Sequence, residues 1–126
     1  MLENNKDLLK KIQELEETIE LLTFRQDLLF SNTSVDRALY EYDITKKQYN
    51  LIMDLMDKYR TKIDNKEQVS HGVFEREMYD IVPQHSGNYH FVESLTRAFW
   101  ENDRWEEVFN NLYRVLPKYQ YIKKGL

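Results

Sequence analysis

The sequence has no cysteine, and only three glycines and two prolines occur among its 126 residues. Without cysteine, disulfides, thiolate zinc sites and thiol nucleophiles are excluded. The scarcity of glycine and proline argues against sandwiches and barrels, which need many turns, and three isolated glycines form no phosphate-binding loop. No apolar run approaches the roughly 20 residues that span a bilayer, and the first residues lack the basic start and continuous apolar run that are typical of a signal peptide. We therefore expect a cytoplasmic protein that makes no use of a membrane.

Charged residues make up 32% of the chain, and the formal net charge is −4. A high charged fraction with few turn-forming residues favours long helices with solvated faces. The negative net charge provides no overall attraction to nucleic acid or anionic lipid. We predict an all-α protein with two parts. Residues 1–30 form an N-terminal coiled-coil helix, and residues 31–126 form a bundle of about five helices, a single compact unit that takes in the end of the first helix.

The first helix carries a repeating apolar pattern, which we name the ladder. Its members follow steps of four and three with one polar step at residue 26: Leu8, Ile12, Leu15, Ile19, Leu22 and Leu29. Such a repeat makes a narrow stripe on an α-helix, and a narrow stripe favours pairing with another helix. β-Branched residues at heptad position a with leucine at d favour a parallel dimer, in which Lys11 of one chain can pair with Glu16 of the other. The alternatives are a higher oligomer and an antiparallel hairpin within one chain.

Capping signals divide the rest of the chain into helices. The polar cluster 31–34 competes with helical hydrogen bonding and should end the first helix. Thr45 with Gln48 three residues later forms a capping box that should open the long helix of the bundle. Asp103 with Glu106 has the same spacing and is expected to open the last helix.

Residues 35–63 have the lengths of a helix-turn-helix, and Lys46 and Lys47 stand at the start of its second helix. A dimerising coil would supply the two-fold symmetry that DNA half-sites require. The body of that helix carries Asp54 and Asp57, however, and few side chains that read base edges. A DNA-binding transcriptional regulator with Lys46 and Lys47 as nucleic-acid contacts is therefore the alternative function.

Aromatic residues are abundant: nine Tyr, six Phe and two Trp. Several lie near the turn between the last two helices, where helical spacing does not place all of them on one side. They form either core or an exposed patch that anchors a partner protein. The candidate partner surface comprises Trp100, Trp105, Tyr113, Tyr119 and Tyr121.

Histidines and carboxylates suggest a possible metal or hydrolytic site only weakly. His71, His85 and His90 can be combined with Glu75 or Glu93, but their spacing matches no recurrent zinc pattern. We therefore predict no catalytic residues, no metal and no cofactor, and we predict that the protein is not an enzyme. An enzyme with a His/carboxylate site is the remote alternative.

Three sequence segments carry a resemblance. They are Leu39-Tyr-Glu-Tyr-Asp-Ile-Thr-Lys-Lys-Gln-Tyr before a Met-rich helix, Val69-Ser-His-Gly-Val-Phe-Glu, and Trp105-Glu-Glu-Val-Phe. With the short coil, they resemble the YhaI-like proteins, small helical proteins of low-GC Gram-positive bacteria and their phages, over most of residues 8–115. The family has no assigned activity, so the resemblance implies an all-helical oligomer and supports nothing catalytic. We therefore expect a non-enzymatic interaction, adaptor or regulatory protein that associates with itself and binds another protein, such as a phage-encoded factor binding a host protein.

Overall fold

The computed structural model describes residues 2–121, and their side chains from residue 4 onward. Two short parts of the predicted units lie outside the described residues. They are Met1 of the coiled-coil helix (1–30) and residues 122–126 of the bundle (31–126). The α-helices are α1 (Leu2–Ser31), α2 (Ser34–Glu41), α3 (Lys46–Asp64), α4 (His71–Ile81), α5 (Tyr89–Glu101) and α6 (Glu106–Leu112), with 3₁₀ turns at Pro83–His85 and Pro117–Tyr119. No strand occurs in this range. The predicted all-α fold, with a long first helix and five further helices, is confirmed.

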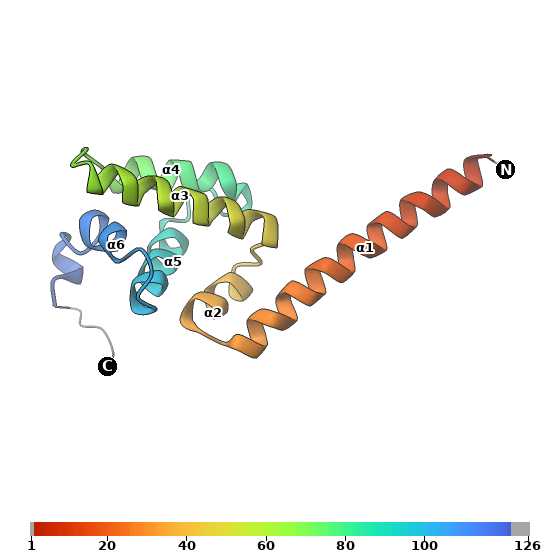
Figure 1. Ribbon diagram of the computed structural model, residues 1–126, viewed down its shortest axis with the longest axis horizontal. Helices are drawn as coiled ribbons and strands as arrows, with labels where there is room; N and C mark the ends of the chain where they lie inside the picture. Colours follow the sequence, from red (N-terminus) through yellow and green to blue (C-terminus); the bar gives the residue numbers. More distant parts are fainter. Residues whose placement is uncertain (1, 122–126) are drawn as a thin grey trace.

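Helices α2 to α6 pack together into one body, and α1 projects from it (Figure 1). In the body, α3 lies against α4 and α6, while α5 lies against α2, α4 and α6. α2 also contacts α1 and so stands between the projecting helix and the rest of the body. Residues 4–23 of α1 are all exposed, so about 30 Å of helix at 1.5 Å per residue extends from the body.

Large aromatic side chains fill the core of the body. Six of them are fully buried: Tyr59, Phe74, Phe91, Phe99, Phe109 and Tyr113. They come from α3, α4, α5, α6 and the turn after α6, so all the long elements of the body share one core. Each such side chain contributes roughly 1.5–3 kcal/mol by leaving water.

The core includes three members of the candidate partner surface, and this corrects that prediction. Trp100, Trp105 and Tyr113 are buried. The chain reverses between α5 and α6, with Asp103 and Trp105 at positive φ, and α6 then packs against α5. The Trp105 ring meets the Phe99 ring edge-on at 5.0 Å. Because the reversal brings both tryptophans into one core, these three side chains form no exposed aromatic patch.

One of the two predicted capping boxes is present. The Gln48 backbone N–H donates to Thr45 Oγ1, and the Thr45 N–H donates to Gln48 Oε1, both at 3.1 Å. The Asp103 prediction is wrong, because α6 begins after Trp105 and has no side-chain cap. The Trp105 indole is buried and donates from Nε1 to Asp57 at 2.7 Å, which holds this residue in its left-handed conformation in place of a cap.

The last two turns of α1 fasten it to the body. Leu28 is only 5% exposed. The Phe24 ring lies 6.3 Å from the Tyr49 ring of α3. Arg25 donates to Asp43 at 2.7 Å, and its guanidinium lies 4.0 Å from the centre of the Tyr40 ring. The first helix therefore enters the bundle with its final turns only.

The Thr45 cap should measurably stabilise the body. We expect Thr45→Ala to lower the free energy of unfolding by about 1 kcal/mol, because a backbone N–H at the start of α3 loses its acceptor. Urea unfolding at a fixed protein concentration measures this loss. Thr61→Ala, at an exposed position in the last turn of α3, is the matched control and should leave the unfolding free energy almost unchanged. Equal losses in both variants would contradict a specific role for the cap.

Candidate functional site

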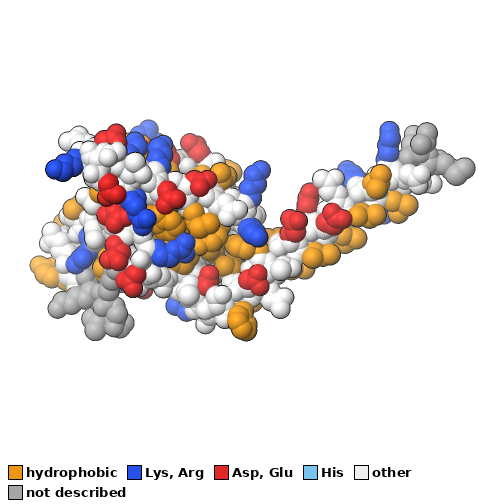
Figure 2. All heavy atoms as spheres, in the orientation of Figure 1, with side chains coloured by type: hydrophobic (Ala, Val, Ile, Leu, Met, Phe, Trp, Pro, Cys, Tyr) orange, Lys and Arg blue, Asp and Glu red, His pale blue; other side chains and the backbone are white. Residues whose placement is uncertain are grey.

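The ladder is the largest apolar feature on the surface of α1. Its six side chains are between 50% and 62% exposed: Leu8, Ile12, Leu15, Ile19, Leu22 and Leu29. Figure 2 shows hydrophobic side chains along one edge of α1 and carboxylates along the opposite edge. A continuous exposed stripe of leucine and isoleucine is a recognised mark of an interaction surface.

The ladder faces away from the body. Phe24 and Leu28, which contact the body, lie roughly 100–160° around the helix from the Leu22 and Leu29 positions at 100° per residue. The body therefore does not cover the ladder, and it leaves room for a second helix along it. This arrangement differs from the predicted alternative in which a hairpin within one chain would bury the stripe.

Charged residues flank the ladder at the two positions that a coiled coil uses for pairing. Lys11 falls at position g and Glu16 at the following e, and both are exposed. None of the ion pairs among the described residues includes either side chain. In a parallel pair, position g of one helix faces position e of the other, so both charges can be paired between chains.

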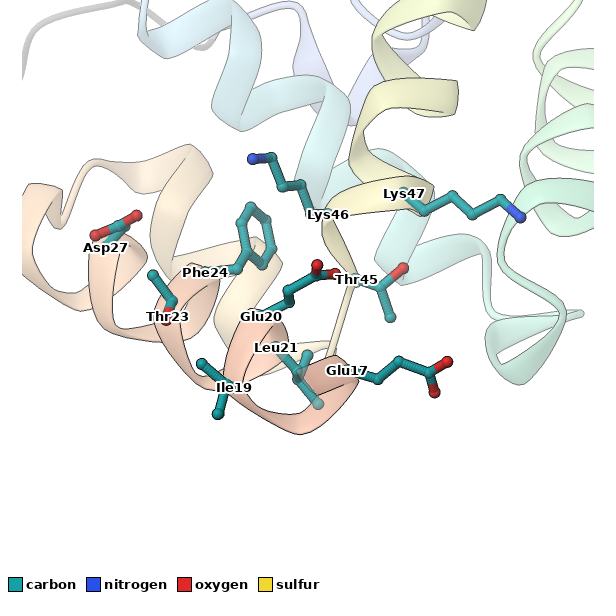
Figure 3. Close-up of a pocket in the computed structure, with 10 residues that line it drawn as sticks. All are labelled: Glu17, Ile19, Glu20, Leu21, Thr23, Phe24, Asp27, Thr45, Lys46 and Lys47. Carbon is teal, nitrogen blue, oxygen red and sulfur yellow. The ribbon is translucent and has the colours of Figure 1, made fainter. Parts of the chain in front are cut away.

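A cleft of about 570 Å³ lies between α1 and the start of α3 (Figure 3). Phe24 points from α1 toward α3, and Leu21 and Ile19 add apolar surface. Charged residues stand on both walls, with three carboxylates on α1 and two lysines on α3: Glu17, Glu20, Asp27, Lys46 and Lys47. The cleft is absent from the sequence-based predictions, although Phe24 and Leu21 depart from the ladder spacing and signal a second contact face.

The cleft bears on the DNA-binding alternative. Lys46 and Lys47 are exposed, but carboxylates of α1 line the same cleft, so a phosphate backbone approaching the start of α3 would also meet negative charge. In addition, α2 packs mainly on α5 and α1, and α3 on α4 and α6. In a helix-turn-helix the recognition helix must stand clear for the major groove. The surroundings of Lys46 and Lys47 therefore do not favour DNA.

A polar cluster forms around the buried Glu93 of α5, where the chain after α6 packs against this helix. Lys118 Nζ donates to both Glu93 carboxylate oxygens at 2.9 Å, and Tyr119 Oη donates to Glu93 Oε2 at 2.7 Å. Glu93 is buried, and these bonds compensate its charge. Tyr119 thus has an internal partner and is half-buried, whereas Tyr121 is 89% exposed. Tyr121 is the one member of the candidate partner surface that stands fully in solvent.

Glu75 is buried near this cluster, and its Oε2 atom has no hydrogen-bond partner. Burial raises the pKa of this carboxyl, and the nearby Glu93 charge raises it further, while His71 and Lys118 lower it. The Tyr113 hydroxyl is also buried without a partner, and burial raises its pKa strongly. Burial thus shifts both groups toward their neutral forms.

The three histidines lie in separate environments. His85 Nε2 donates to the Tyr42 carbonyl at 2.6 Å, and His90 lies beside the Tyr89 ring at 4.1 Å. His71 is exposed at the start of α4, 5.9 Å from the Tyr113 ring. Among residues 2–121, no group of three His, Asp or Glu side chains is placed to hold a metal ion.

No family model, curated protein or solved structure matches this chain. The resemblance to the YhaI-like proteins therefore stays a prediction. In the described part of the chain, no helix combines the length and the apolar character needed to cross a bilayer. The site has to be interpreted from its own geometry.

Glu75 should make stability depend on pH. Because its pKa is raised in the folded protein, the folded state favours the protonated form, and stability is lost as pH rises above the ordinary carboxyl range. We expect Glu75→Gln to be more stable than the natural chain by about 1 kcal/mol at pH 7, with the difference disappearing near pH 4. Thermal unfolding across this range measures the effect. The exposed Glu67→Gln is the matched control, and a pH-independent difference for Glu75→Gln would refute the assignment.

Proposed function

We propose that this is a cytoplasmic, non-enzymatic interaction protein that associates with itself through the ladder of α1. The observation that carries the proposal is the exposed ladder on the side of α1 that faces away from the body. Each leucine or isoleucine that a second copy covers contributes roughly 1.5–3 kcal/mol. A helix that projects alone into water gains none of this, so association of copies is the natural way to cover the stripe.

The hydrogen bonds of the polar side chains in the body support a structural role for the body. Glu93 is bound by Lys118 and Tyr119. Glu77 accepts from Lys58 and from Tyr59, both at 3.0 Å. These contacts join neighbouring elements of the bundle, as expected of a rigid unit that the paired helices hold and display.

Self-association along the ladder leaves other surfaces free for a second protein. The cleft between α1 and α3 is lined mainly by residues outside the ladder, such as Glu17, Glu20 and Phe24, and it borders the ladder only at Ile19. Its mixed lining, with Phe24 and Leu21 beside carboxylates of α1 and lysines of α3, suits an amphipathic segment of a partner protein. An adaptor role, including the binding of a host protein by a phage-encoded factor, is consistent with this arrangement and is part of the proposal.

Two substitutions in the ladder test self-association in the full-length chain. We expect Ile12→Asn with Leu15→Asn to convert an oligomer, most simply a dimer, into single chains, because two adjacent apolar layers are lost from the seam. Light scattering measures the mass, and circular dichroism confirms that the body stays folded.

The matched control places asparagine at the two intervening positions, Gln13 and Glu14, which are exposed and lie outside the ladder. This control has the same loss of helix propensity and should keep the oligomeric mass. A natural chain that scatters as a single chain at micromolar concentrations would refute the proposed function.

A further inference from the structure

We infer that two copies pair in parallel and in register, and that their interface continues past the ladder to the elbow, residues 26–31, where α1 ends. There Phe30 of each copy packs against the partner's Arg25. This inference rests on the proposed self-association and adds its orientation and a second contact surface.

The elbow carries the most exposed large apolar side chain of the described residues. Phe30 is 91% exposed, and it follows Leu29 of the ladder, whereas the preceding Leu28 is buried in the body. In heptad register Phe30 falls at position e, directly beside the seam. The apolar surface of α1 thus extends to the point where the helix joins the body, and a partner helix must reach that point to cover it.

The orientation decides whether the two elbows meet. An antiparallel pair that sets Ile12 opposite Leu15 also sets Leu22 opposite the polar Asn5. It separates the two Phe30 residues by roughly 50 Å at 1.5 Å per residue. A parallel, in-register pair instead places Leu22 on Leu22, Asn5 on Asn5 and the two elbows side by side. Only the parallel pair matches apolar with apolar along the whole ladder.

The charges that flank the ladder give a second, independent reason for parallel pairing. In a parallel pair, the g position of Lys11 faces the e position of Glu16 in the other copy, twice by symmetry. In the antiparallel register, g faces g and e faces e, so Lys11 would face Thr18 and Glu16 would face Leu9. Lys11 and Glu16 would then have no oppositely charged partner, and Leu9 of each copy would face the Glu16 carboxylate of the other copy.

Arg25 links the seam to the body at the elbow. It falls at position g, which faces Phe30 of the other copy in a parallel pair. Its guanidinium is already held by Asp43 at 2.7 Å and lies over the Tyr40 ring at 4.0 Å. A planar guanidinium accepts a second aromatic ring on its other face. Because Phe24 at position f and Leu28 at position c hold the body on the outer side of α1, two parallel copies place most of each body outside the seam.

Engineered cysteines test the orientation, because the chain has none of its own. A disulfide forms only when two Cα atoms lie roughly 4.4–6.8 Å apart. We would mix the Asn5→Cys chain with the Leu22→Cys chain, oxidise the mixture and identify the cross-linked peptides by mass spectrometry. The expected result is links between like positions, 5 to 5 and 22 to 22.

Two different results would contradict parallel pairing and self-association separately. Links between positions 5 and 22 would show an antiparallel pair and would overturn the inference while self-association stands. Single-chain mass of the reduced mixture, measured by light scattering, would overturn both.

The elbow contact has its own test. We expect Phe30→Ala to raise the dissociation constant about tenfold, which corresponds to about 1.4 kcal/mol. Tyr121→Ala is the matched control, since that aromatic ring is equally exposed but lies outside α1. In the Arg25→Lys background, which keeps the charge and removes the planar surface, Phe30→Ala should have a smaller effect. A dissociation constant that Phe30→Ala leaves unchanged would overturn the elbow contact.

Discussion

The anchoring of α1 by its last two turns determines how the rest of the molecule is presented. Leu28 is buried, Phe24 meets Tyr49, and Arg25 is held by Asp43 and stacked over Tyr40. Phe24 and Leu28 lie on the side of α1 away from most of the ladder, while Arg25 lies between that side and the ladder. The docking of a few residues thus sets the direction in which some 30 Å of apolar helix surface faces.

The body is built so that this anchor has a rigid base. Its core joins aromatic rings from α3 to α6, and its buried carboxylates bond to neighbouring elements, as Glu93 does to Lys118 and Tyr119. Glu75 is the exception, because its free oxygen atom is buried without a partner. Burial raises the pKa of this carboxyl and so favours its neutral form, which costs less to bury than the charged form.

The fold class and most helix ends could be predicted from the sequence, because they depend on interactions between residues that are close in the chain. The Thr45–Gln48 box and the break near Ser31 act through hydrogen bonds between residues that are close in the chain. The Asp103 box failed because burial of Trp105, a long-range effect, decided the conformation there. The same packing removed three aromatic residues from the candidate partner surface. The cleft between α1 and α3 was not predictable either, since it depends on the angle between two helices.

The distribution of charge along α1 would at first favour antiparallel pairing. The heptad positions of the charged residues show why it does not decide the orientation. The first half of the helix is rich in lysine and the second in glutamate: Lys6, Lys10 and Lys11, then Glu14, Glu16, Glu17 and Glu20. An antiparallel pair would set these halves against each other. Most of these residues occupy positions b, c and f, however, on the outer sides of a two-stranded pair, where water and salt screen them within about 8 Å. Of these seven residues only Lys11 and Glu16 lie beside the seam, and their spacing of five residues is the one that a parallel pair uses.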